Sequence, residues 1–245
     1  MFSESIQETL FMKIAITGGA GFVGSHIATA YLDAGHDVFI VDTLVNSPRQ
    51  APCSLDPRAR FYQVDIRDAQ LRNIFQNERP DIVSHHAAQH SPHFYGRQAL
   101  VDADVHIRGL LNVLEACAGA CVRKLIFASN GTTMYLPIPL TGYTHHELPI
   151  AKEDTPLCPQ HPDDISKVAG EWYVRYYTRQ HGVSHTILRY ADIYGESGLE
   201  SVQHPCAYFT AMLAANQRPI IRGSGQDIRD HIYIDDVVRA NLCAL

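Results

Sequence analysis

The stretch KIAITGGAGFVGSHIATAYLDAGHDVFIVD, residues 13–42, decides the fold of this chain. It opens with a short apolar run typical of a buried strand, Lys13–Thr17, which leads into a glycine-rich turn. A helical pattern then begins at Phe22 and ends at Gly35, and Asp37–Asp42 is typical of a second strand. Strand, helix and strand in this order predict a unit whose two strands lie parallel in one sheet.

The same alternation continues through most of the chain. We expect further strands at 60–65, 81–88, 122–129 and 184–190, and helices at 68–78, 98–118 and 165–180. This pattern predicts an α/β fold with a doubly wound parallel sheet that is covered by helices on both faces. After Tyr190 the rhythm loosens into short strands and loops at 219–236 and a last helix that Asp235 and Asp236 open. We therefore divide the chain into an N-terminal extension (1–11), a main domain (12–190) and a smaller lobe (191–245).

Composition excludes several classes of protein. The 245 residues, 46% apolar and 19% charged, are enough for one sizeable core with a small appended lobe. The 20 basic and 26 acidic residues give a net charge of −6 without a basic block, so we expect no nucleic-acid partner. No apolar run is long enough to span a bilayer, and the first residues lack the pattern of a secretory signal. The six cysteines have no paired spacing, which favours free thiols in the cytoplasm.

The glycine-rich turn carries a chemical signal. Gly18, Gly21 and Gly24 have the spacing that allows a tight turn, close approach of a pyrophosphate and close helix–strand packing. Phe22 and Val23 begin the helix, where free backbone N–H groups and the helix dipole attract phosphate. The alternative is a glycine turn in an α/β domain without this ligand. The strand before the turn and the helix after it favour a dinucleotide site.

Polar and small residues follow the other strands of the predicted sheet. Asp42 ends the second strand, 18 residues after Gly24, where a carboxylate accepts hydrogen bonds from ribose and repels a 2′-phosphate. This position predicts NAD rather than NADP. Asp65, the pair Ala87 and Ala88, and Ser129 end the third, fourth and fifth strands, and ligands of open α/β sheets lie beside these ends.

With these residues placed, the sequence resembles the extended short-chain dehydrogenase/reductase family. Within this family it is most similar to NAD-dependent nucleotide-sugar epimerases and dehydratases of the UDP-glucose 4-epimerase type. The resemblance runs from Met12 to the C-terminus, and because family members continue further, we expect an incomplete C-terminal substrate lobe. The matching segments are TGGAGFVGSH, VDIRD, HHAAQ, GLLNVLEAC, ISKVAGE, HTILRYADIYG and GSGQDIRDHIYIDDV.

The resemblance implies roles for particular residues. The family's cofactor contacts fall on Gly18, Gly21, Gly24, Asp42, Asp65, Ile66, Ala87, Ala88 and Lys167. In the family this lysine holds the nicotinamide ribose and lowers the pKa of a tyrosine one helical turn earlier, which exchanges a proton with the sugar. Contacts to the diphosphate of the nucleotide sugar fall on Asp192 and Arg229, and arginine suits phosphate because its planar fork pairs with the oxygens.

The chain departs from the family pattern in its chemical half. Asp163 stands where the resemblance implies the tyrosine, four residues before Lys167, and Asp192 stands where the family has asparagine. Gly131 replaces the usual serine or threonine, although Thr132 and Thr133 offer hydroxyl groups nearby. The cofactor half is therefore preserved, whereas the catalytic half is altered.

Asp163 allows two interpretations. It is a candidate base, but an aspartate with an ordinary pKa of about 3.9 is a poor base for a sugar hydroxyl, and Lys167 nearby favours its ionised form. The alternative is an acid at the start of a helix, or an ion pair with Lys167. His161, whose ordinary pKa is near neutrality, is a substitute acid–base candidate, with an exposed loop histidine as the alternative.

A group of histidines, His85, His86, His90 and His93, raises the question of a metal site. Their spacing matches no zinc template, and no cysteine or glutamate lies close in the sequence to complete one. We therefore expect no metal.

The resulting hypothesis is an NAD-dependent epimerase or dehydratase that transiently transfers hydride from a nucleotide sugar to bound NAD, with impaired catalysis. The alternative is an NAD-binding sensor or degenerate paralogue without redox catalysis. A third hypothesis is a ketone reductase that uses NADH. The expected partner is a nucleotide sugar, with no membrane, and a homodimer is the candidate assembly.

Overall fold

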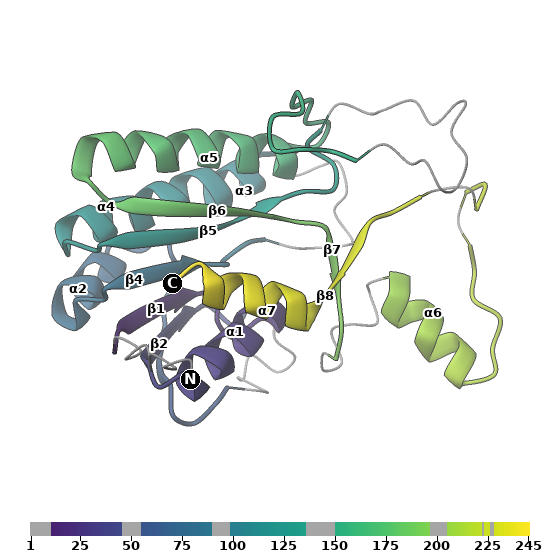
Figure 1. Ribbon diagram of the computed structural model, residues 1–245, viewed down its shortest axis with the longest axis horizontal. Helices are drawn as coiled ribbons and strands as arrows, with labels where there is room; N and C mark the ends of the chain where they lie inside the picture. The colour runs from purple at the N-terminus through teal and green to yellow at the C-terminus, as the bar shows by residue number, and fades with distance from the viewer. Residues whose placement is uncertain are drawn as a thin grey trace, which may run out of the picture.

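A computed structural model describes residues 11–45, 55–89, 99–135, 150–196, 205–221, 223–225 and 228–245 (Figure 1). The strands are β1 (Lys13–Thr17), β2 (Asp37–Asp42), β3 (Arg60–Gln63), β4 (Ile82–His85), β5 (Lys124–Asn130), β6 (Ser184–Tyr190), β7 (Asp192–Tyr194) and β8 (His231–Tyr233). The helices are α1 (Phe22–Asp33), α2 (Gln70–Glu78), α3 (Ala99–Ala103), the π-helical segment η3 (Asp104–Gly109), α4 (Leu110–Gly119), α5 (Pro162–His181), α6 (Pro205–Ala214) and α7 (Ile234–Cys243).

Six strands form one parallel sheet in the order β3-β2-β1-β4-β5-β6. This is the doubly wound, Rossmann-type order, so the predicted fold class is confirmed. The direction of winding reverses between β1 and β4. The carboxyl ends of the strands meet at this crevice, and ligands of such sheets bind there.

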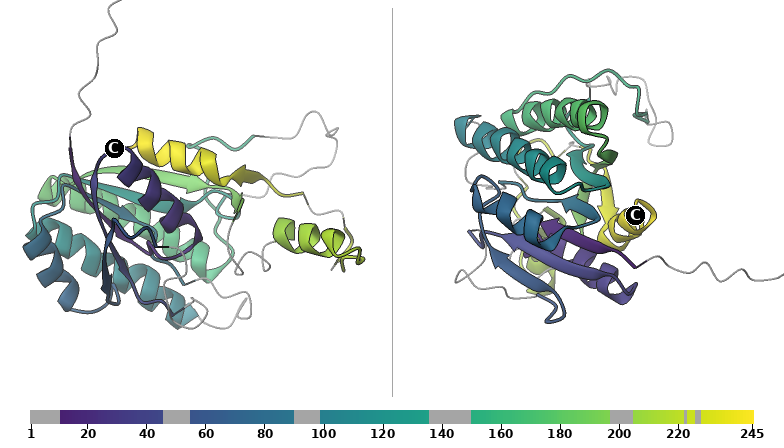
Figure 2. Two further views of the ribbon diagram at one scale, coloured as in Figure 1. Left: turned by 90° about the horizontal axis from the view of Figure 1, so that it is seen from below. Right: turned by 90° about the vertical axis from the view of Figure 1, so that its left-hand side faces the viewer.

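Helices cover both faces of the sheet (Figures 1 and 2). The helices α2, α4 and α5 pack on one face, where Phe39, Phe75 and Phe127 belong to a single buried cluster. On the other face, a second cluster joins the isoleucines of the central strands to α1. Because central strands are buried on both faces, they read as continuous apolar runs rather than alternating ones.

The last helix belongs to the packing of this second face. Residues of α7 and the end of the chain, Val238, Leu242 and Leu245, contact the cluster that contains α1. The predicted division of the chain at residue 190 stays a prediction. Helix α7 lies after residue 190 in the sequence, yet it packs beside the main sheet. By contrast, α6 stands apart from the sheet layers (Figure 2).

Two predicted helices differ in detail from the structure. The single helix expected at 98–118 is interrupted by η3, a wider π-helical turn that periodicity does not reveal. Helix α5 begins at Pro162 rather than at residue 165, because proline is favoured in the first turn, where its missing N–H costs nothing. No helix among the described residues is long and apolar enough to cross a membrane.

Candidate active site

The glycine turn forms a close-fitting loop between β1 and α1. Gly18 has φ +71°, and a Cβ atom there would lie 2.5 Å from the backbone nitrogen of Ala87. A Cβ atom on Gly24 would overlap the carbonyl oxygen of Gly18. Gly21 caps α1 without a side-chain hydrogen bond, and the first turn, which begins with Phe22 and Val23, holds no acidic residue. The helix start is thus open to an anion.

Asp42 is oriented by the backbone around it. The Ala20 N–H donates to its Oδ2 atom at 3.0 Å, and the Leu44 N–H donates to its Oδ1 atom at 2.9 Å. Each carboxylate oxygen can accept a second hydrogen bond. The arrangement therefore fits ribose hydroxyl groups, and it places a negative charge where NADP would bring a phosphate.

Asp65 and Ile66 follow β3. The Arg67 side chain binds the Asp65 carboxylate, with Nε 2.9 Å from Oδ1, and this hydrogen bond lowers the pKa of Asp65. Ile66 is buried against Gly109. Asp65 is thus held as an anion by a neighbouring cation, and Ile66 packs beneath the helical segment that follows β4.

The end of β4 places Ala87 and Ala88 beside the glycine loop, where Ala87 faces Gly18. Before them, buried His85 lies 2.6 Å from the Thr17 hydroxyl, and burial holds the pKa of His85 well below its usual value. Burial also lowers the pKa of His86, to about 3. No group of three or more possible metal ligands occurs in the described parts of the chain, and His90 and His93 lie outside them.

Ser129, at the end of β5, uses its side chain within the protein. Its hydroxyl donates to Oε1 of buried Glu171 at 2.8 Å, and Glu171 also binds Arg189. Its predicted part in cofactor binding stays a prediction.

Lys167 reaches from α5 toward the same edge of the sheet. Its ammonium group donates to the carbonyl oxygen of Ala128 at 2.8 Å and lies over the ring of Phe127. Burial lowers the pKa of Lys167, whereas the charge of Asp163 acts in the opposite direction. The lysine is thus held by β5 next to the strand ends.

Asp163 lies in the first turn of α5, and its side chain is 44% exposed. Its Oδ1 atom is 2.9 Å from Nδ1 of buried His106, which lies in η3. Sequence reasoning missed His106, because a regular helix gives no sign of the π-helical turn that contains it. His161 caps α5 and is exposed.

The hydroxyl groups near Gly131 are already engaged. The Thr133 hydroxyl donates to buried Asp164 at 2.5 Å, and the Thr132 hydroxyl donates to Asp192 at 3.3 Å. A Cβ atom on Gly131 would lie 2.8 Å from the Arg189 carbonyl oxygen. The backbone path therefore leaves little room for a side chain at this position.

Asp192 and Arg229 form a pair between β7 and the segment before β8. The Arg229 guanidinium lies 3.3 Å from Oδ2 of Asp192, and the Arg229 side chain is 52% exposed. The unexpected negative charge of Asp192 is therefore balanced by the arginine that we expect to bind phosphate. A guanidinium carries five N–H donors, so one contact with Asp192 does not use all of them.

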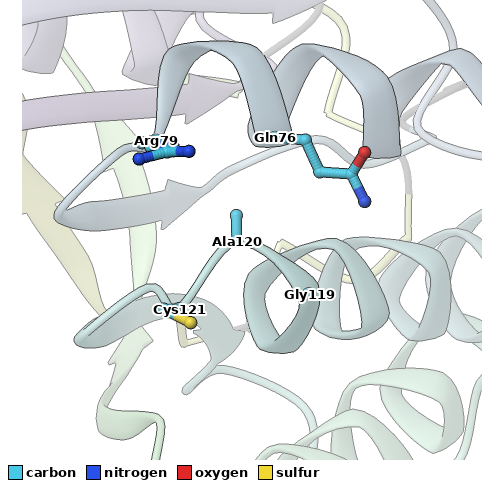
Figure 3. Close-up of a pocket in the computed structure, with 5 residues that line it drawn as sticks. All are labelled: Gln76, Arg79, Gly119, Ala120 and Cys121. Atoms are coloured by element: carbon cyan, nitrogen blue, oxygen red, sulfur yellow. The ribbon is translucent and has the colours of Figure 1, made fainter.

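These features gather on one edge of the sheet. A groove of the described surface lies elsewhere, where α2 and α4 end, and is lined by Gln76, Arg79, Gly119, Ala120 and Cys121 (Figure 3). It contains none of the residues of the candidate site. The close approach at Gly18 and Gly24, the open start of α1 and the oriented Asp42 together fit a dinucleotide cofactor.

Comparison with known proteins agrees with this geometry. Residues 14–245 match the NAD dependent epimerase/dehydratase family. The UDP-glucose 4-epimerase of Lactobacillus helveticus is 30% identical over 249 residues, which cover 96% of this chain and 72% of that protein.

Two solved structures are similar over nearly the whole chain. The UDP-glucose 4-epimerase of Thermotoga maritima, determined with UDP-glucose, is 34% identical with a TM-score of 0.80, covering 94% of this chain and 72% of that one. The UDP-glucose 4-epimerase of Thermus thermophilus, in complex with NAD, is 33% identical with a TM-score of 0.82. The match covers 96% of this chain and 74% of that one. The predicted resemblance is confirmed, and this chain belongs to the NAD-dependent epimerase/dehydratase family.

Proposed function

We propose that this chain binds NAD and a nucleotide sugar of the UDP-glucose class, and that it oxidises the sugar transiently and slowly. The observation that carries this proposal is the cradle of Gly18, Gly24 and oriented Asp42, which shares one edge of the sheet with Lys167. NAD supplies the hydride acceptor when it is bound. The protein binds the pyrophosphate at the start of α1, the ribose at Asp42 and the nicotinamide ribose at Lys167.

Arg229 supports a nucleotide-sugar substrate. Its exposed guanidinium is oriented by Asp192, and a planar fork of N–H groups suits the oxygens of a diphosphate. The relative of known structure from Thermotoga maritima was determined with UDP-glucose. The same class of ligand therefore suits the exposed guanidinium of Arg229 in this chain.

Asp163 supports slow turnover. An ionised aspartate accepts a hydrogen bond from a hydroxyl, but with an ordinary pKa of about 3.9 it is a weak base and a poor source of a returning proton. A second candidate function follows from this observation: an NAD-dependent binding protein that recognises the sugar nucleotide without converting it.

The proposal extends to assembly and location. A homodimer through α5 is supported by the exposed aromatic side chains of Trp172, Tyr173 and Tyr176 on that helix, since exposed apolar patches mark contact surfaces. Light scattering of the purified chain should then give twice the monomer mass. The cytoplasm is the proposed compartment, because the cysteines of the sequence have no paired spacing.

The proposed ligands can be tested by mass spectrometry and calorimetry. Native mass spectrometry of the purified chain should show bound NAD, and titration of the NAD-loaded chain should show binding of UDP-glucose. Arg229→Ala should weaken nucleotide binding about 10- to 100-fold, the range for hydrogen bonds to charged groups. Arg239→Ala, which removes an exposed arginine on α7, is the matched control. Unchanged affinity in Arg229→Ala would show that the pose or the substrate class is wrong.

A further inference from the structure

Four charged side chains join the loop after β3 to the helical segment η3. The Arg67 guanidinium contacts both carboxylate oxygens of Asp65, with Nε 2.9 Å from Oδ1 and Nη2 2.5 Å from Oδ2. The remaining nitrogen of the guanidinium, Nη1, donates to Oδ2 of Asp104 in η3 at 2.6 Å. Asp104 is also paired with Arg108 of the same segment. One planar guanidinium thus holds the Asp65 carboxylate against a distant segment of the chain.

The Asp65 carboxylate keeps room for one further hydrogen-bond donor. Its Oδ1 atom accepts from the backbone N–H and from Nε of Arg67, at 2.8 Å and 2.9 Å. Within the described part of the chain, its Oδ2 atom accepts from Nη2 of Arg67 alone. Because each carboxylate oxygen can accept two hydrogen bonds, Oδ2 has one acceptor position left. The Asp65 side chain is 32% exposed, so the protein does not enclose it.

Asp65 lies on the side of the site where the purine base of NAD is expected. Strand β3 is the neighbour of β2 in the sheet, and the Val64 N–H donates to the carbonyl oxygen of Asp42 at 3.1 Å. Asp42 is the proposed ribose ligand, and the glycine loop after β1, on the other side of β2, is the proposed pyrophosphate site. Phosphate and base are attached to opposite sides of the adenosine ribose. The base therefore extends toward β3 and Asp65.

The chemistry of a carboxylate determines which base it accepts. The hydrogen bond from Arg67 lowers the pKa of Asp65 and so keeps it ionised. An ionised carboxylate has no proton to donate, so it binds a base that offers an N–H group, as adenine does with its 6-amino group. Hypoxanthine has a carbonyl oxygen at the same position, and two acceptors that face each other form no hydrogen bond. This selection requires a carboxylate that cannot turn away from the base.

We propose that Arg67 and Asp104 are positioning residues, which hold the Asp65 carboxylate toward the 6-amino group of adenine and make the cofactor site selective for an aminopurine. This role rests on the proposed function, because it needs NAD at the glycine loop. Arg67 orients the carboxylate through both of its oxygens, and Asp104 keeps the guanidinium in place. Loss of either residue should therefore reduce the selectivity for the base more than the affinity for the rest of the dinucleotide.

Calorimetry of the full chain with NAD and with nicotinamide hypoxanthine dinucleotide, whose purine carries an oxygen in place of the amino group, tests this role. The unmodified chain should bind NAD about 10- to 100-fold more tightly, the range for a hydrogen bond to a charged group. Arg67→Leu should lose most of this preference, and Asp104→Ala should lose part of it. Arg58→Leu is the matched control and should keep the preference, because Arg58 contacts Asp56 through the same atoms at the opposite end of β3.

A second variant leaves Arg67 in place. Asp65→Asn keeps the shape, and its amide offers a donor as well as an acceptor, so it should bind both dinucleotides with nearly equal affinity. An unchanged preference in Arg67→Leu, or equal weakening of both dinucleotides, would overturn the role of Arg67. A full preference in Asp65→Asn would overturn the recognition of adenine by Asp65, even where Arg67→Leu fails to fold. If the unmodified chain binds neither dinucleotide, the proposed function fails as well.

Discussion

Gly24 shows how a single residue sets up the cofactor site. A methyl group there would overlap the Gly18 carbonyl oxygen and lie 2.7 Å from the Gly19 Cα atom, so the loop would have to move. Gly24→Ala should lower the free energy of unfolding by about 1–3 kcal/mol, as overpacking does, and weaken NAD binding. Gly119→Ala is the matched control, because a Cβ atom there meets nothing within 4 Å. Chemical denaturation and NAD titration of both variants check this, and equal behaviour would contradict it.

Asp42 sets the choice between the two nicotinamide cofactors. Its carboxylate is held by the Ala20 and Leu44 N–H groups at the place where NADP carries an additional phosphate. The chain should bind NAD more tightly than NADP, and Asp42→Ala should narrow this difference. Asp33→Ala, on the exposed surface, is the control for loss of charge. Calorimetry that finds equal or tighter binding of NADP by the unmodified chain would remove the argument.

For individual residues of the candidate site, the sequence predicts a role only where that role follows from a local pattern. The glycines and Asp42 are tied to a strand–turn–helix–strand pattern, so their positions follow once the elements are placed. His106 does not follow, since it meets Asp163 across 57 residues of sequence through a π-helical turn. The balancing of Asp192 by Arg229 is likewise a contact between distant segments, which no local pattern predicts.

Helix α5 is joined to the sheet by a buried ionic group. Glu171 is 1% exposed and binds Arg189 of β6, Ser129 of β5 and Arg175 of its own helix. Burial alone would raise the pKa of Glu171, but these partners outweigh burial, so its pKa lies below the ordinary value of about 4.5. Because the folded pKa is lowered, the stabilisation is present at neutral pH and is lost as the pH falls below about 4.5.

Glu171→Gln should therefore lower the free energy of unfolding at pH 7 by about 1.5–3 kcal/mol. The difference from the unmodified chain should shrink when urea unfolding is repeated at successively lower pH below the ordinary carboxyl value. Asp236→Asn, which breaks an exposed ion pair of α7, should change the free energy of unfolding little at any of these pH values. A difference that grows on acidification would mean that the sign of the shift is wrong.

The elements themselves are largely predictable from the sequence. The strands of the main sheet follow from short apolar runs, because strands covered on both faces leave no polar alternation. The interruption at η3 is not predictable, since Asp104–Gly109 keeps a pattern compatible with an ordinary helix. The predicted start of α5 at residue 165 is too late, because the helix includes Pro162, a residue that is favoured in the first turn but lies outside the apolar periodicity.

At the scale of the whole molecule, the order of the sheet brings all these residues to one edge. Strands β1 and β4 are neighbours although β2 and β3 come between them in the sequence, and this crossover places Ala87 against Gly18. The packing of α7 beside α1 does not follow from the sequence, because a short amphipathic helix after irregular segments does not reveal which core it joins. The sheet therefore positions the residues that are expected to bind the cofactor, whereas the catalytic part of the candidate site depends on α5 and η3.

The most direct test of this account compares turnover of UDP-glucose by the unmodified chain and by Asp163→Tyr, both with NAD bound. We predict that both proteins bind NAD and UDP-glucose, that the unmodified chain turns over slowly or not at all, and that Asp163→Tyr recovers measurable epimerisation. The recovery is expected because a phenol beside Lys167 can exchange a proton with the sugar, which a fixed carboxylate does poorly. Rapid turnover by the unmodified chain that survives Asp163→Ala would contradict the account.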